Sequence, residues 1–97
     1  MSASKFYVEL SKPAREDFRD ILNYTVQLWG KEQAEIYADI LNDALHTIAS
    51  SPKGGSVKTK KLRVFIIKKH KIFYRINKNK IYIVRILHSR MNEVKHI

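Results

Sequence analysis

The spacing of apolar residues changes once along this chain, and the change limits the folds available to it. Between residues 13 and 51, apolar side chains recur every three or four positions, which is the period of an amphipathic helix. Between residues 62 and 87, they alternate with polar residues or form short runs, a pattern typical of strands. A helical half followed by a strand-forming half predicts an α+β domain.

The helical half is expected to divide into two helices at Gly30. Ser11 is a favourable N-cap and Pro13 is tolerated in a first turn, so the first helix should start here and run to Trp29. Glycine can adopt the positive φ that ends a helix, and a second helix should follow from about Lys31 to Ser51. So short a connection predicts an antiparallel helical hairpin. The expected buried stripes are Ala14, Phe18, Ile21, Thr25 and Leu28, then Ala34, Tyr37, Leu41, Ala44 or Leu45, and Ile48.

Four segments are expected to form strands, one before the helices and three after them. They span residues 6–10, 62–68, 71–77 and 80–87, with turns at 69–70 and 77–79. The last segment is apolar at nearly every position except Arg85, which predicts a strand buried on both faces.

The remaining segments are interpreted as irregular. Residues 53–61 are rich in lysine and glycine and should form a flexible basic loop, and His88 to Ile97 should form a short polar tail. The predicted order is β-α-α-β-β-β, with the helical hairpin packed on one face of a mostly antiparallel sheet. A single domain over residues 1–97 is expected from this length.

The charge of the chain is divided as unevenly as its predicted secondary structure. Residues 1–50 contain five Lys/Arg and eight Asp/Glu, whereas residues 51–97 contain fourteen Lys/Arg and one acid, Glu93. A surface that only aids solubility would mix the two signs. The basic half therefore predicts contact with nucleic acid, an acidic protein or another anionic surface.

Several functional classes find no support in the sequence. The chain has no cysteine, so neither a disulfide framework nor a thiolate metal site can form, which fits a cytoplasmic location. The four histidines lack the spacing of a metal site, and no phosphate-binding glycine motif occurs. The longest apolar runs are four residues, whereas a membrane helix needs about 20. No metal, cofactor or membrane contact is expected.

Short motifs are distributed over nearly the whole chain, from residue 6 to residue 97. Those in the helical half are Leu10-Ser11-x-x-Ala14-x-x-Asp17-Phe18-x-x-Ile21, Tyr24-Thr25 and Trp29-Gly30-x-x-Gln33-Ala34-x-x-Tyr37. Those in the strand half are Arg63, His70-x-Ile72-Phe73-Tyr74-Arg75, Ile83-x-Arg85-Ile86-Leu87-His88-x-Arg90-Met91 and a closing His96-Ile97. Their order and spacing resemble those of the ParE toxins, a branch of the ParE/RelE superfamily.

The resemblance implies the toxin half of a bacterial type II toxin–antitoxin pair with the β-α-α-β-β-β architecture. It also implies a ParD-like antitoxin, whose disordered C-terminal segment folds onto the toxin in a hetero-oligomer, and a role in plasmid maintenance. The implied target is DNA gyrase, whose inhibition halts replication. The alternatives are a ribosome-dependent mRNA endonuclease of RelE type and a basic nucleic-acid-binding module without toxicity.

The residues expected to bind the target or the antitoxin are mostly basic side chains of the strand half. They are Arg63, His70, Arg75, Arg85, His88, Arg90, Met91 and Trp29. The helix pair and the sheet should supply an apolar groove for an amphipathic acidic segment, with a basic rim from the Lys/Arg of residues 58–90. No catalytic residue is assigned, because the lysines and tyrosine of the superfamily's nucleases cannot be mapped onto this chain.

Three of these residues have competing interpretations. Arg85 interrupts an apolar strand, so its charge needs either a salt bridge to a helix carboxylate such as Asp17 or a ligand. His88 is either an acid or base in a nuclease or a histidine bonded to the backbone at a strand end. Trp29 is either a staple for the turn between the helices or an exposed anchor for a partner.

Overall fold

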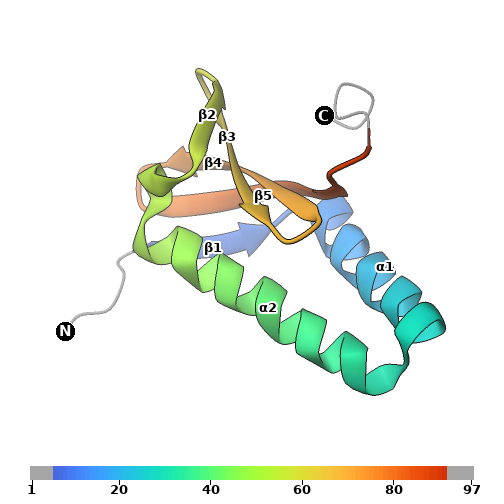
Figure 1. Cartoon of the computed structure of the whole chain (residues 1–97). Helices are drawn as coiled ribbons and strands as arrows, with labels where there is room; N and C mark the ends of the chain where they lie inside the picture. Colours follow the sequence, from blue (N-terminus) through green and yellow to red (C-terminus); the bar gives the residue numbers. More distant parts are fainter. Residues whose placement is uncertain (1–5, 92–97) are drawn as a thin grey trace.

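The computed structural model describes residues 6–91, which follow the predicted order with one additional strand (Figure 1). The elements are β1 (Tyr7–Leu10), α1 (Lys12–Trp29), α2 (Lys31–Ser50), the 3₁₀ turn η1 (Pro52–Gly54), β2 (Ser56–Thr59), β3 (Leu62–Ile67), β4 (His70–Asn77) and β5 (Lys80–His88). The His96-Ile97 motif and most of the expected polar tail lie outside the described residues. No helix in the described part of the chain is long and apolar enough to cross a membrane.

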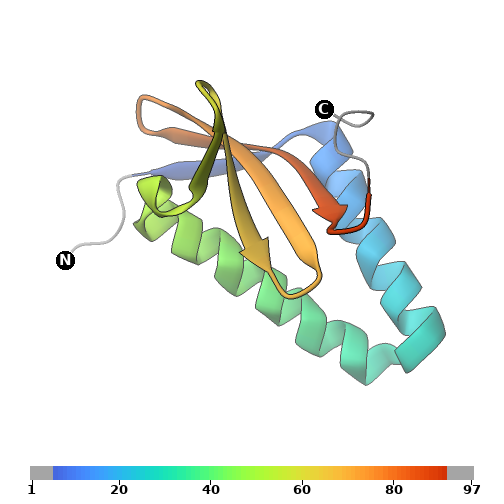
Figure 2. The same cartoon turned by 45° about the horizontal axis from the view of Figure 1, so that its top comes forward.

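The five strands form one mixed sheet in the order β1-β5-β4-β3-β2. β1 runs parallel to β5, and the other neighbours are antiparallel, which confirms the mostly antiparallel sheet. Both helices lie on the same side of the sheet, and the β2–β3 turn stands away from them (Figures 1 and 2). The α+β arrangement of a helical hairpin on one face is therefore confirmed.

The helix boundaries follow from their capping residues. The Ser11 Oγ atom accepts a hydrogen bond from the Ala14 N–H at 3.0 Å, as an N-cap does. Gly30 adopts φ 93° and separates the two helices. The inclusion of Leu28 in the buried stripe was wrong, since 54% of this residue is exposed. The turn between the helices lies far from the sheet, so the sheet does not cover the last turn of α1 (Figure 1).

The core lies between the helices and one face of β4 and β5. Its buried members from the strands are Ile72, Tyr74, Ile81, Ile83 and Ile86, and those from the helices are Ala14, Ala44, Ile48 and Ala49. In β3, Phe65 and Ile67 pack against this core, whereas Ile66 is 63% exposed. The alternation along β3 therefore places its odd-numbered residues toward the helices.

The expectation of a flexible loop at residues 53–61 was wrong, because this segment contains η1 and the edge strand β2. The Tyr74 hydroxyl donates to the Pro52 carbonyl at 2.6 Å and accepts the Gly55 N–H at 3.2 Å. The Arg63 Nη1 atom donates to the carbonyl oxygens of Lys53 and Gly55. These contacts hold a lysine- and glycine-rich segment in place from β3 and β4, which its local composition does not reveal.

The first hairpin turn is shifted by one residue from its predicted place, and the second is one residue shorter than predicted. His70 is the first residue of β4, so the turn expected at residues 69–70 lies at Lys68–Lys69, and the next turn lies at Lys78–Asn79. Lys68 and Lys78 have φ values of 54° and 58°, in the left-handed region that two-residue hairpin turns require. Glycine or asparagine is the usual residue there, so neither lysine is the residue expected at its turn position.

α1 and β5 are joined at an irregularity in the sheet. Phe73 pairs with Arg85 and Tyr74 with Ile83, so Val84 is an extra residue in β5. Ser11 and α1 provide partners for backbone groups of β5 at and after this bulge, where β5 extends beyond its pairing with β1. The Ser11 hydroxyl donates to the Val84 carbonyl at 2.8 Å, and the Asp17 carboxylate accepts the Ile86 N–H at 2.9 Å.

Candidate functional site

Two of the predicted site residues, His70 and His88, lie side by side at one end of the sheet. They are direct cross-strand partners at the start of β4 and the end of β5. Their ring centroids are 5.3 Å apart, in an edge-to-face arrangement. The Ser89 N–H donates to the Lys69 carbonyl at 2.8 Å and ties the chain after β5 to the β3–β4 turn.

Tyr37 of α2 completes this pair from the helix side of the sheet. Its hydroxyl lies 2.5 Å from the Nδ1 atom of His70. Burial raises the pKa of the Tyr37 phenol, partly offset by a hydrogen bond with the Lys69 backbone. Burial, together with the charge of His88, lowers the pKa of His70 to about 4, so this ring is neutral at physiological pH.

The hydrogen bonds fix which ring nitrogen carries the proton. The Arg90 backbone N–H donates to Nδ1 of His88 at 3.1 Å, so a neutral His88 carries its proton on Nε2. A protonated phenol next to His70 likewise donates to Nδ1 and leaves the proton on Nε2. No buried side-chain nitrogen or oxygen of the described residues lacks a partner, so both unpartnered Nε2 atoms reach solvent. Each histidine therefore offers one N–H donor.

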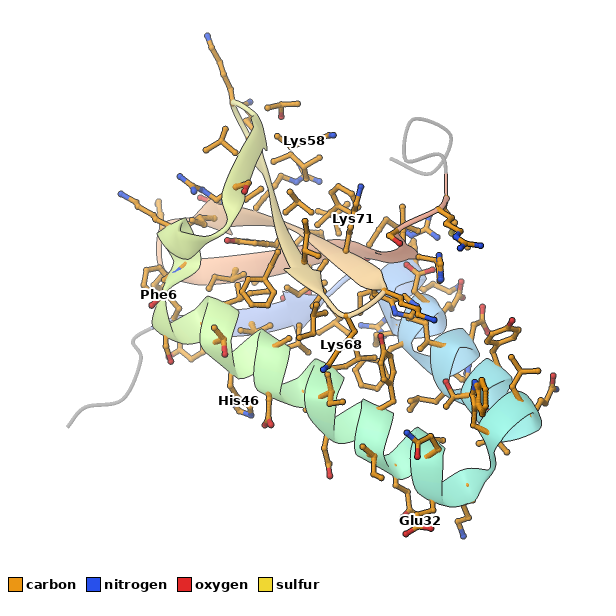
Figure 3. All side chains as sticks on the ribbon, in the orientation of Figure 1. Phe6, Glu32, His46, Lys58, Lys68 and Lys71 are labelled. Carbon is orange, nitrogen blue, oxygen red and sulfur yellow. The ribbon has the colours of Figure 1, made fainter. Side chains whose placement is uncertain are left out.

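Three exposed cations lie next to these donors in the chain: Lys68 and Lys69 in the β3–β4 turn and Arg90 after β5. We call His70 and His88, with these three residues, the histidine end of the sheet. Figure 3 labels Lys68 on the helix side of the turn and Lys71 above the sheet. No cluster of three or more potential metal ligands occurs among residues 6–91. N–H donors and cations suit an anionic ligand.

Arg85, also a predicted site residue, is bound inside the protein. Its Nε atom lies 2.7 Å from Asp17 Oδ2, and its Nη2 atom lies 2.8 Å from Asp17 Oδ1. The side chains of the pair are 21% and 12% exposed. Of the two interpretations of Arg85, the structure supports the salt bridge to the helix carboxylate.

Arg63, Arg75 and Met91 are not brought together with the histidine pair in one cluster. Arg63 contacts the carbonyl oxygens beside η1, as described above. Arg75 is exposed on the sheet face away from the helices, where its guanidinium lies 6.0 Å from the centre of the Tyr82 ring. Met91 is exposed just beyond the histidine end, and its N–H donates to the His88 carbonyl at 2.9 Å.

Trp29 lies at the opposite end of the molecule, beside the turn between the helices. It is 73% exposed, so its interpretation as a staple for that turn was wrong. Tyr24, Val26, Leu28 and Ile36 are also exposed on the helices. Trp29 is thus available to a partner but takes no part in the histidine end.

An apolar groove of about 480 Å³ lies between α1, α2 and the end of β1. Its apolar lining is Leu10, Phe18, Leu22 and Leu45, and its polar lining is Arg15, Arg19, Asn23 and Asn42. An apolar groove was predicted from the sequence, but the prediction assigned its basic rim to the Lys/Arg of residues 58–90. The lining cations are instead the arginines of α1, so the basic strand half lies outside this groove.

Sequence reasoning missed Tyr37 as a partner of His70, although it placed Tyr37 in the buried stripe of α2. The two residues are 33 positions apart, and no local pattern connects them. It also did not single out Lys68. Lys68 was assigned to the end of the preceding strand, and its unusual backbone conformation appears only in the structure.

Sequence comparisons with known proteins find a matching family and related chains. Residues 8–93 match the family described as "ParE toxin of type II toxin-antitoxin system, parDE". The chain is 36% identical over 92 residues to "Toxin ParE1" of Caulobacter vibrioides, covering 91% of this chain and 94% of the relative. It is 32% identical over 87 residues to "Toxin ParE1" of Mycobacterium tuberculosis, covering 86% and 89%.

The fold is also similar to that of a solved structure. A chain of the "Chromosomal ParDE TA system from P. aeruginosa" superposes with a TM-score of 0.77 and 16% identity. The match covers 89% of this chain and 98% of that one. It supports the order of elements and the five-stranded sheet.

Proposed function

The chain belongs to the ParE toxin family of type II toxin–antitoxin systems, and from this premise we propose that it inhibits DNA gyrase and is neutralised by a ParD-like antitoxin. The observation that carries the proposal is the match to the family over residues 8–93, nearly the whole described chain. The gyrase target comes from the resemblance to ParE toxins.

The helical groove supports capture of an antitoxin segment. Leu10, Phe18, Leu22 and Leu45 offer an apolar surface between two helices, which an amphipathic segment can cover. Arg15 and Arg19 lie beside it and favour acidic residues in that segment.

The histidine end favours binding over cleavage. A general base needs a free lone pair near neutral pH, but Nδ1 of each histidine already accepts a hydrogen bond. The low pKa of His70, caused mainly by burial, also leaves it without the extra proton that a general acid donates at neutral pH. This chemistry supports a non-enzymatic inhibitor and gives less support to the mRNA endonuclease.

Purified toxin should inhibit supercoiling by DNA gyrase or accumulate cleaved DNA in the presence of gyrase, and added antitoxin should reverse the effect. Folded toxin in large excess with no effect on either reaction would contradict the gyrase target. Primer extension on translated messages after induction separates the alternative, because codon-linked cuts would indicate a ribosome-dependent nuclease.

A further inference from the structure

The two lysines at the tips of the β3–β4 and β4–β5 turns have a backbone conformation that disfavours lysine. Lys68 and Lys78 are the only residues other than glycine with positive φ in the described part of the chain. A side chain with a Cβ atom is strained there, and glycine would remove the strain. Because both lysines share this strain, the surroundings of each decide what its side chain can do.

Lys68 differs from Lys78 in its surroundings. It adjoins Lys69 and the histidine pair, whose Nε2 atoms are solvent-accessible N–H donors. Lys78 belongs to the opposite end of β4, where Lys80 already forms a salt bridge with Glu9 at 2.6 Å. The histidine end therefore combines positive charge with the N–H donors of two histidines. The β4–β5 turn, which contains Lys78, has positive charge but no histidine.

The strands that form the histidine end carry no carboxylate side chain. Residues 51–91, which contain β2 to β5, include thirteen Lys/Arg and no Asp or Glu. The apolar groove that an amphipathic acidic peptide would fill lies instead between the helices, beside Arg15 and Arg19. The histidine end thus suits a ligand that is recognised by its negative charge and by hydrogen bonds. Phosphate oxygens carry negative charge and accept hydrogen bonds.

We propose that the histidine end binds the phosphodiester backbone of duplex DNA. Lys68, Lys69 and Arg90 neutralise phosphates, and the Nε2–H groups of His70 and His88 donate hydrogen bonds to phosphate oxygens. The commitment to DNA, and the placing of this contact in the gyrase–DNA complex, rest on the proposed function. The binding itself needs no gyrase and can be measured without it.

The test is fluorescence anisotropy of the full chain with a labelled 20-base-pair duplex over a series of salt concentrations, the duplex length being chosen as about two helical turns. Lys68→Gly should weaken binding by about 3- to 10-fold and reduce the slope of log K against log salt by about one. The matched control is Lys78→Gly, which removes the same charge from the same backbone conformation and should change binding by less than about twofold. Neither variant should lower the melting temperature, because glycine relieves the strain at positive φ.

Several outcomes would overturn the inference. They are equal weakening by Lys68→Gly and Lys78→Gly, absence of binding at low salt, tighter binding of a single-stranded RNA of equal charge, or equally tight binding of poly-glutamate. The last would point to an acidic protein as the ligand.

The gyrase assay separates this inference from the proposed function. If the two variants differ on free DNA but the wild type does not affect gyrase, the DNA site stands and the target is wrong. If Lys68→Gly loses DNA binding yet inhibits gyrase as the wild type does, the role of the DNA contact is wrong and the target stands.

Discussion

The carboxylate of Asp17 in α1 holds Arg85 in β5 by two hydrogen bonds of 2.7 and 2.8 Å. The same carboxylate accepts the N–H of Ile86, in the part of β5 that extends beyond its pairing with β1. One side chain therefore satisfies both a partly buried charge and a backbone donor, and it fixes α1 on the sheet.

Asp17→Ala should lower the free energy of unfolding by about 2–3 kcal/mol, because it removes the carboxylate that binds both the Arg85 guanidinium and the Ile86 N–H. Urea unfolding measures the loss. Asp20→Ala, at an exposed position of the same helix, should cost less than about 0.5 kcal/mol. Equal effects of the two variants would show that the pair with Arg85 does not stabilise the fold.

Gly55 lies against Tyr74 where the chain enters β2. A Cβ atom there would overlap the Tyr74 hydroxyl and come within 2.9 Å of the Val64 carbonyl oxygen. Gly55→Ala should therefore displace β2 and lower the free energy of unfolding by about 2 kcal/mol or more. At Gly54, the nearest atom to an added Cβ is Ser51 Cβ at 3.6 Å, so Gly54→Ala should be tolerated. Similar melting temperatures for the two variants would contradict this packing.

The contrast between these glycines explains which parts of the fold were predictable. Local signals sufficed where a residue acts on its own neighbours, as Ser11 does in capping α1 and Gly30 in separating the helices. β2 was missed because distant residues, Tyr74 and Arg63, hold it in place. The site was predicted in part for the same reason. His70 and His88 were identified by residue type, but their approach depends on strand register, and Tyr37 reaches His70 only through the packing of α2.

Stability should decrease at mildly acidic pH because of His70. Burial lowers its pKa from the ordinary value of 6.5 to about 4 in the folded chain. Between these values the unfolded chain binds a proton that the folded chain does not, so the free energy of unfolding falls as the pH is lowered through this range. Above about pH 6.5 this contribution is constant. His70 is partly exposed, so solvent screening reduces the effect.

Urea midpoints between pH 7 and pH 4, a range set by the two pKa values of His70, test this dependence. His70→Gln should flatten the curve, whereas His46→Gln, at an exposed position of α2 labelled in Figure 3, should leave it as in the wild type. A curve that is unchanged by His70→Gln would assign the acid sensitivity to another group.

Trp29→Ser should have little effect on folding, in spite of the size of the side chain. Because 73% of Trp29 is exposed, the change in the free energy of unfolding should stay within about 0.5 kcal/mol. Phe18→Ser, which removes an aromatic ring packed against the core, should cost about 3 kcal/mol or more. A large loss from Trp29→Ser would mean that the turn between the helices depends on this ring after all.

Leu22 allows the antitoxin groove to be tested apart from the fold. It lines the groove and is absent from the core cluster, so Leu22→Glu places a charge on the binding surface at a small cost in stability. The added carboxylate would be desolvated under an apolar segment and would repel an acidic one. We expect antitoxin affinity to fall by at least about 30-fold, or about 2 kcal/mol, in isothermal titration calorimetry.

Val57→Glu makes the same change at an exposed apolar residue of β2, far from the groove in the sheet order, and should keep the wild-type affinity. If both variants bind equally, the antitoxin uses another surface. Loss of affinity in both would point to charge alone, whereas loss only with Leu22→Glu identifies the helical groove as the contact.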